Sequence, residues 1–164
     1  MAVLVSDTSI IIDLERGNLL EDLFRLPFEF AVPDLLFRNE LAGELGQQLV
    51  ALGLRVEELG PDELARAIAV RREQARLSTP DTFAFALAEQ RAWSLLTGDG
   101  ALRELAKSIG VPTHGVLWIC DRFAEHGIVP NGRLSASLQG IFDHPRCRLP
   151  AAEVRLRLNR YSAE

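Results

Sequence analysis

The sequence predicts an α/β protein with a central, mostly parallel sheet and a helical C-terminal tail, and three observations lead to this prediction. Short apolar runs alternate with longer segments of helical periodicity, an order typical of βαβ units. Two of these runs end at an aspartate, Asp7 and Asp99, just where a helical segment begins. Beyond Gly115 only helical segments are expected.

Five short segments are expected to form the sheet. The first is continuously apolar, which is typical of a strand buried on both faces, and the third is expected to be a short edge strand. The strands are predicted at residues 2–6, 28–32, 54–57, 94–97 and 111–113.

Helices are predicted between the strands and along the tail. Pro61 begins one of them, because proline fits the first turn and the acids that follow complement the helix dipole. Ser78 or Thr79 is expected to cap the next helix, which has Pro80 in its first turn. The others are predicted at residues 9–15, 19–25, 44–52, 116–126, 132–142 and 151–160, with one after Pro33 that carries Glu40 and one that ends at Gly110.

The segment 151–160 is ambiguous from its pattern. Val154, Leu156 and Leu158 alternate with arginines, which is a strand-like period. The residues from Pro150 onward nevertheless make a good helix start, so a helix is expected.

Composition indicates one domain over residues 1–164, with a core of about residues 1–115 and a helical extension of about 116–164. Hydrophobic residues make up 48% of the chain, enough for a sizeable core. The net charge of −5 does not indicate a nucleic-acid-binding protein, which more often has a basic face. Most basic residues are arginines in two groups, and a solvated helix face explains the first group without any function. They are Arg66, Arg71, Arg72 and Arg76, then Arg146, Arg148, Arg155, Arg157 and Arg160.

The cysteines and the apolar runs bear on the compartment. Cys120 lies in an apolar run, is expected to be a buried thiol and forms no close pair with Cys147, so a reduced, cytoplasmic setting fits. The sequence shows no signal-peptide pattern, and no apolar run approaches the ~20 residues that span a bilayer. The three histidines are scattered without the spacing of a zinc site.

Four acidic residues, Asp7, Glu40, Asp81 and Asp99, suggest a metal-dependent nuclease. Open α/β sheets build their sites at the carboxyl ends of strands. Mg²⁺ and Mn²⁺ prefer oxygen ligands, and such ions assist phosphodiester hydrolysis by neutralising phosphate oxygens and lowering the pKa of bound water. Each residue also has an ordinary interpretation: Asp7 and Asp99 as helix caps or turn residues, Asp81 as a first-turn acid, and Glu40 on a solvated helix face.

In four segments the chain resembles the PIN-domain nucleases, including the VapC-type toxins. The segments are VLVSDTSIIIDL, VPDLLFRNEL, STPDTFAFALAEQR and LLTGDGALRELAKSIGV, which together span about residues 2–115. The tail HGVLWICDRFAEHGIVPNGRLSASLQGIFDHPRCRLP is similar to a C-terminal extension found on one branch of these proteins. The resemblance implies a PIN-like three-layer α/β/α fold.

The resemblance also implies roles for the four acids. Asp7 matches the central metal ligand, and Asp81 and Asp99 would complete the site directly or through water. Glu40 would orient metal-bound water or hold a second ion.

Two hydroxyl residues also match the family pattern, and two other positions differ from it. Ser9 and Thr97 match residues that would hydrogen-bond to the carboxylates or to a bound phosphate. Pro80 replaces the small residue that often precedes the third acid, and Gly100 stands where a basic residue is common. Neither departure removes a ligand.

The implied function is a Mg²⁺- or Mn²⁺-dependent endoribonuclease that hydrolyses single-stranded RNA, expected to be the toxin of a toxin–antitoxin pair. Its expected partners are RNA, an antitoxin protein and a second copy of the chain in a homodimer, and no membrane. The homodimer has modest support from crowded apolar residues such as Phe24, Phe28, Phe30 and Trp118, which a monomer core explains almost as well. A catalytically idle PIN-like module that binds RNA or a regulatory partner remains the alternative.

Other phosphate chemistries fit the sequence poorly. There is no G-x-G-x-x-G after the first strand, no phosphate-binding G-x-x-x-x-G-K-[ST] and no G-x-S-x-G elbow. Phosphatases with an aspartyl nucleophile have a second aspartate two residues after the first, and this chain has Ser9 at that position. Two spare acids are interpreted as lying outside the site, Asp13 as solvent-facing and Asp121 as a helix surface residue.

Overall fold

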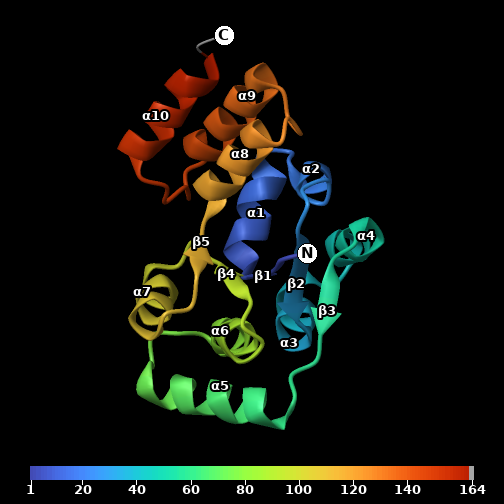
Figure 1. Ribbon diagram of the computed structural model, residues 1–164, viewed down its shortest axis with the longest axis vertical. Coiled ribbons are helices and arrows are strands. Elements are labelled where there is room, and N and C mark those ends of the chain that lie inside the picture. Colours follow the sequence, from blue (N-terminus) through green and yellow to red (C-terminus); the bar gives the residue numbers. More distant parts are fainter. Residues whose placement is uncertain (163–164) are drawn as a thin grey trace.

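The computed structural model describes residues 1–162 and contains a five-stranded sheet in the order β3-β2-β1-β4-β5 (Figure 1). Every pair of neighbouring strands is parallel, so the predicted parallel sheet is confirmed. The chain moves outward from β1 first in one direction and then in the other, which places the reversal of strand order between β1 and β4. The carboxyl ends at such a reversal border a crevice. The strands are β1 Val3–Ser6, β2 Glu29–Pro33, β3 Arg55–Glu57, β4 Ser94–Leu96 and β5 Thr113–His114.

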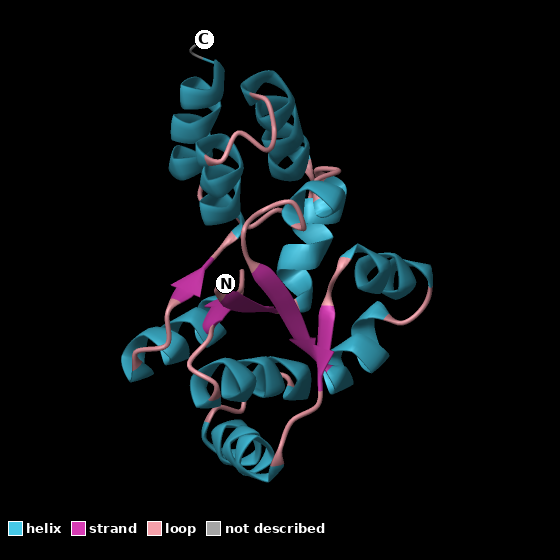
Figure 2. Ribbon diagram, turned by 45° about the vertical axis from the view of Figure 1, so that its right-hand side comes forward, coloured by secondary structure: helices cyan, strands magenta, loops and turns pink. Residues whose placement is uncertain are grey.

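Helices cover both faces of the sheet, which gives the expected three layers (Figure 2). Successive strand residues point to opposite faces, so Leu4 and Val5 belong to different hydrophobic clusters. The Val5 side packs against α5, α6 and α7, and the Leu4 side against α1, α2 and the tail. The helices are α1 Thr8–Arg16, α2 Leu20–Leu23, α3 Asp34–Leu36, α4 Glu44–Leu52, α5 Pro61–Glu73, α6 Thr79–Gln90, α7 Gly100–Ile109, α8 Val116–Glu125, α9 Asn131–Asp143 and α10 Ala151–Ser162, with a π-helical turn η1 Phe37–Leu41.

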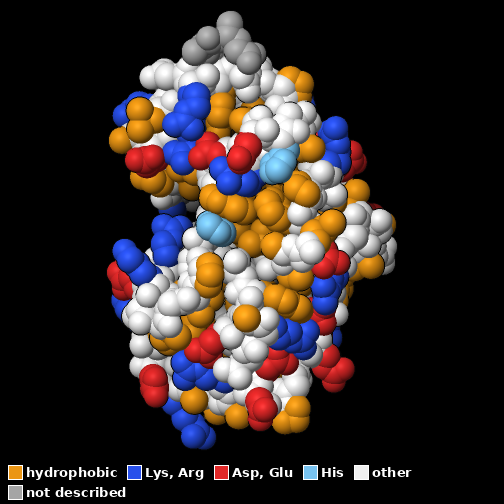
Figure 3. Space-filling view, viewed as in Figure 1, with side chains coloured by type: hydrophobic (Ala, Val, Ile, Leu, Met, Phe, Trp, Pro, Cys, Tyr) orange, Lys and Arg blue, Asp and Glu red, His pale blue; other side chains and the backbone are white. Residues whose placement is uncertain are grey.

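The tail forms a helical layer beyond α1, because α8 and α9 pack on α1 and α10 packs on α9 and α8. The ambiguous last segment is the helix α10, as expected. Its buried residues Val154 and Tyr161 are two turns apart on one face, whereas Leu156 is 57% exposed. Figure 3 shows a hollow on the left between this tail and the part of the molecule below it. Within residues 1–162 no helix is long and apolar enough to cross a bilayer.

Asp121 of α8 is a correction to the sequence interpretation, which placed it on the helix surface. Its carboxylate accepts hydrogen bonds from the Arg157 guanidinium, with Nη2 at 2.9 Å from Oδ2, and from the Tyr161 hydroxyl at 2.8 Å. The neighbouring Cys120 is buried, which confirms the predicted buried thiol, and burial raises the pKa of this thiol to about 12. Asp121 is therefore a structural acid that joins α8 to α10.

Two elements differ locally from their predicted forms. The helix expected after Pro33 begins as α3 but widens into the π-helical turn η1. The backbone passes close to α4 here, because a Cβ on Gly46 would lie 2.2 Å from the Leu41 carbonyl oxygen. The last strand is Thr113–His114, two residues later than its predicted start, because the pairing with β4 begins there.

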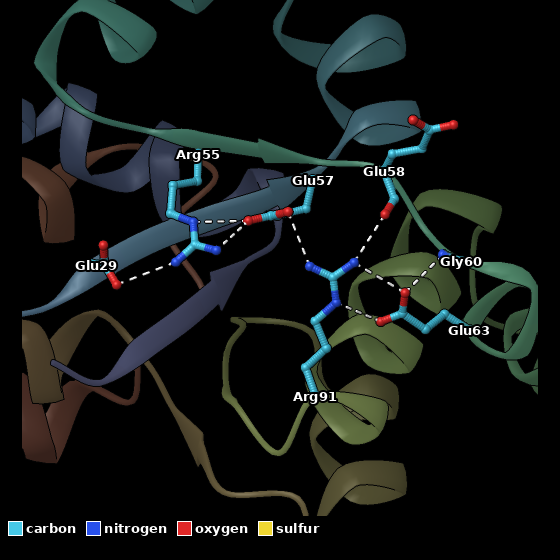
Figure 4. A network of polar contacts seen from close by, with 7 residues as sticks. All are labelled: Glu29, Arg55, Glu57, Glu58, Gly60, Glu63 and Arg91. Atoms are coloured by element: carbon cyan, nitrogen blue, oxygen red, sulfur yellow. Dashed lines mark hydrogen bonds and ion pairs between the residues drawn. The ribbon is translucent and has the colours of Figure 1, made fainter.

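A network of arginines and glutamates ties β3 to α5 and α6 on the side of the sheet away from the tail (Figure 4). Arg91, just after α6, donates to Glu63 of α5 through Nε at 2.7 Å and to Glu57 of β3 through Nη1 at 3.0 Å. Arg55 donates to Glu57 at 2.8 Å and to Glu29 at 3.2 Å. The first group of arginines is thus only partly a solvated face, since Arg66 in turn pairs with Glu89 at 2.7 Å.

Candidate active site

Asp7 directly follows the central strand β1 and lies at the reversal of strand order. Its side chain is almost fully buried, with 2% of the residue exposed. Oδ1 accepts from the Ser9 hydroxyl at 2.7 Å and from the Ile10 amide at 3.2 Å, and Oδ2 accepts from the Thr97 hydroxyl. Burial raises the pKa of the Asp7 carboxyl above its ordinary value, these hydrogen bonds oppose the rise, and the charge of Asp99 adds to it.

Asp99 follows the neighbouring strand β4 and is connected to Asp7 through hydroxyls. The Thr97 hydroxyl donates to Asp7 and accepts the Asp99 amide at 3.0 Å. The Ser9 hydroxyl likewise donates to Asp7 and accepts the Gly98 amide at 3.2 Å. The predicted bonds from Ser9 and Thr97 to a carboxylate are therefore present, and they orient the two strand ends toward each other.

Asp81 approaches from the first turn of α6, which is capped by Ser78 through a hydrogen bond from the Asp81 amide at 3.2 Å. Burial raises the pKa of Asp81 to about 6, the Ser78 hydroxyl opposes the rise, and three further charges add to it. Those charges are Asp7, Asp99 and Glu40, in that order of effect. The charges of the other three acids predicted from the sequence therefore all act on Asp81.

Glu40 lies on the π-helical turn η1 and is exposed. The Thr8 hydroxyl, from the first residue of α1, donates to its Oε2. This contact holds Glu40 at the start of the helix that Asp7 caps. Thr8 is a residue of the site that the sequence interpretation missed, and no motif distinguished it from an ordinary helix-start threonine.

The ordinary interpretations of the acids also hold. Asp7 caps α1, and Asp99 caps α7 by accepting the Leu102 amide at 2.9 Å. Capping occupies only one oxygen of Asp99, and the hydrogen bonds found among residues 1–162 leave its Oδ2 without a donor. Asp99 can therefore cap α7 with one carboxylate oxygen and bind a metal ion with the other.

The donor set suits a hard divalent cation, although it is not a closed cage. None of the four acids forms an ion pair with a basic residue in the described part of the chain. Nor do three or more Asp, Glu, His or Cys side chains of residues 1–162 converge closely enough to enclose a metal ion. Mg²⁺ usually takes only one or two carboxylates and keeps several waters, so Asp7 and the free oxygen of Asp99 fit such an ion.

Asp13, on α1, is a second correction, because it does not face solvent as expected. It is half-buried, pairs with Arg16 at 3.5 Å, and lines the same cavity as Asp99. Burial raises the pKa of Asp13, and the nearby Arg16 side chain opposes the rise. It is a neighbour of the acidic cluster with a cation of its own.

Comparison with known proteins identifies the family of the chain. No curated protein sequence matches the chain. Among solved structures, a toxin–antitoxin complex from Klebsiella pneumoniae is similar, with 20% identity and a TM-score of 0.44 over 60% of this chain and 87% of that chain. A model of the family DUF3368, described as a PIN domain, matches residues 3–162. PIN domains are generally nucleases and typically use divalent metals. Because the family match spans almost the entire chain, the protein belongs to this PIN-domain family.

Proposed function

We propose that the protein is a Mg²⁺- or Mn²⁺-dependent endoribonuclease whose site consists of Asp7, Glu40, Asp81 and Asp99. One observation supports the proposal: Asp7 and Asp99 follow neighbouring strands at the reversal point of the sheet, the charges of Asp7, Asp99 and Glu40 raise the pKa of Asp81, and none of the four has a basic partner among residues 1–162. Crowded carboxylates cost free energy in the absence of a cation, so an arrangement that only stabilised the fold would pair them with arginines.

Each side chain has a distinct part in this proposal. A bound divalent ion would neutralise phosphate oxygens and lower the pKa of a bound water. Asp7 and Asp99 would hold it, since Ser9 and Thr97 keep Asp7 oriented. Asp81 would complete the site directly or through water, and Glu40, held by Thr8, would orient the attacking water or hold a second ion.

Single-stranded RNA is the proposed substrate. The crevice at the sheet edge is open, and a single strand can present its splayed backbone there more easily than a duplex. The competing possibility is an idle PIN module that binds RNA or a regulatory partner without cleaving. The presence of all four carboxylates without a basic partner favours the enzyme, because helix capping explains Asp7 and Asp99 but does not require Glu40 and Asp81 beside them.

We also propose a biological setting: the toxin of a cytoplasmic toxin–antitoxin pair, active as a homodimer. A basic side chain of an antitoxin would fit among the four acids and compete with the metal. The aromatic residues that suggested a dimer pack within the monomer, with Phe24 and Phe28 at 5.7 and 6.5 Å from Phe30, so the dimer rests on the family resemblance. A mass near that of one 18.2 kDa chain in light scattering would contradict it.

Cleavage of an RNA panel tests the proposed activity. Purified protein should cut single-stranded RNA with Mg²⁺ or Mn²⁺ and should stop when EDTA is added. Cleavage that persists in EDTA would overturn the proposed metal-dependent mechanism. Absence of cleavage of every RNA and DNA with either ion would leave the idle module as the better description.

A further inference from the structure

A cavity of about 640 Å³ lies beside the acidic cluster, between the carboxyl edge of the sheet and the connection from α9 to α10. Its lining includes Ser9, Gly98 and Asp99 beside the acidic cluster and Arg146, Arg148 and Leu149 of the connection. It corresponds in position to the hollow below the tail in Figure 3, where basic side chains gather. The volume is in the range of sites that hold a small organic group.

The cavity is basic although the protein as a whole is acidic, with a net charge of −5. Four arginines line it against two acids, Asp13 and Asp99. Two of the arginines are engaged, since Arg16 pairs with Asp13 and Arg103 donates to the Thr97 carbonyl at 3.1 Å. The other two, Arg146 and Arg148, are exposed, and their guanidinium groups form no ion pair or hydrogen bond within residues 1–162. Two uncommitted cations at one rim favour an anionic ligand.

One wall of the cavity is a pair of stacked rings. His114, at the end of β5, lies over Trp118 of α8 with ring centroids 4.0 Å apart and an interplanar angle of 13°. Both residues line the cavity and both are half-buried. Burial lowers the pKa of His114, and the charge of Arg122 lowers it further, so the ring is neutral at neutral pH. A flat, uncharged ring beside free arginines is the combination on which proteins stack the bases of single strands.

The geometry points to a nucleotide seat: the cavity holds a base and the adjoining phosphates of a single-stranded RNA, next to the bond that the acidic cluster would cleave. His114, supported by Trp118, carries the base, and Arg146 with Arg148 contacts the phosphates. The inference builds on the proposed function, because Asp99 lines both places and a strand seated here continues directly onto the carboxylates. An acidic peptide would use the arginines but has no need of the stacked rings.

Binding without cleavage tests the seat separately from the nuclease activity. The probe is a labelled uridine oligonucleotide of about 12 nucleotides, within the site sizes of single-strand binders. Its affinity for Asp7→Asn protein is measured by fluorescence anisotropy with Mg²⁺ at several salt concentrations. In that background, Arg146→Ala with Arg148→Ala should weaken binding roughly 20-fold at about 0.1 M salt. The same pair should lower the salt slope by about 1.4, which is the loss of two phosphate contacts on a single strand.

The matched control removes two other exposed arginines. Arg71→Ala with Arg72→Ala changes the net charge equally but lies on α5, across the sheet from the cavity, and should change affinity much less. His114→Ala should weaken binding about 5- to 100-fold with an unchanged salt slope. His114→Phe should restore binding, because it keeps a flat ring on Trp118.

Each outcome decides the matter. Equal losses from the two arginine pairs would show that only overall charge matters and would overturn the seat. Unchanged binding after both the His114 and the Arg146–Arg148 substitutions would assign the cavity to another ligand, such as a protein segment, and would also overturn it. If the variants behave as expected while the wild-type protein cuts no RNA, the seat stands and the proposed nuclease activity falls.

Discussion

Two groups of carboxylates in this protein occupy opposite electrostatic situations. Around Arg91, the acids Glu57 and Glu63 are each held by a guanidinium at 3.0 Å or less (Figure 4). Burial by itself would raise the pKa of these two glutamates, but the hydrogen bonds from arginine outweigh it and the pKa of both is lowered. At the sheet edge, Asp7 and Asp81 are also withdrawn from water, but with other carboxylates as neighbours, and their pKa is raised.

The difference shows which acids serve the fold. The Arg91 network joins three elements, β3, α5 and α6, so its charges contribute to stability. The sheet-edge cluster does the opposite: in the absence of a cation it retains charges that repel one another. Sites built for function commonly sacrifice stability in this way, and the two groups should therefore respond in opposite directions when a charge is removed.

The largest effect is expected from removing one charge at Asp7 or Asp99. Asn caps a helix as well as Asp does, so Asp7→Asn and Asp99→Asn should preserve α1 and α7 while removing the proposed metal ligands. We expect cleavage to fall by about 10³-fold or more, equivalent to roughly 4 kcal/mol. The measurement is the initial rate on a cleaved RNA, with circular dichroism to verify folding.

Asp62→Asn is the matched control, since Asp62 is an exposed acid in the first turn of α5. Its rate should stay at the wild-type level. A near wild-type rate for either sheet-edge variant would show that the residue acts only as a helix cap.

Sequence patterns predicted the strand ends well because that information is local. An apolar run followed by an aspartate and a helical segment predicts that Asp7 and Asp99 each follow a strand, and the structure adds that the two strands are neighbours. Asp81 was placed equally well by its capping serine and proline. These positions depend on residues only a few places away in the chain.

Contacts between distant segments were not predictable in the same way. The π-helical turn that carries Glu40 lies against α4 at Gly46, a contact that no local sequence pattern indicates. Asp121 was assigned to the surface because its partner Arg157 lies 36 residues away. The cavity beside Asp99 likewise exists only because the tail returns to cover the sheet edge.

The next largest effect is expected at the other group of carboxylates. Arg91→Ala leaves Glu57 and Glu63 without their shared cation, and removing one partner of a buried pair typically costs about 3–5 kcal/mol. Because the Arg91 side chain is 28% exposed, we expect a smaller loss in the free energy of unfolding, about 2–3 kcal/mol. Urea denaturation measures it, with the exposed Arg71→Ala as the control at under about 0.5 kcal/mol. A loss equal to that of the control would remove the contrast between the two groups.

The smallest effect is expected from Asp81→Asn. Its sign is opposite to that of Arg91→Ala, because it should increase the stability of the metal-free protein. The pKa of Asp81 is about 6 in the folded protein and 3.8 as its ordinary value, so the folded state holds the proton more tightly. Stability is therefore lost as the pH rises through that window and the loss is complete above pH 6. Asp81 is partly exposed, so solvent screening limits the gain of the variant to about 1 kcal/mol, or roughly 2–4 °C in Tm.

Thermal denaturation in EDTA measures this gain, which should be present at about pH 8 and almost absent near pH 4. Saturating Mg²⁺ should reverse the order, since the wild-type protein binds the ion more tightly. A variant that is less stable than wild type in EDTA at both pH values would show that Asp81 is an ordinary first-turn acid that stabilises α6.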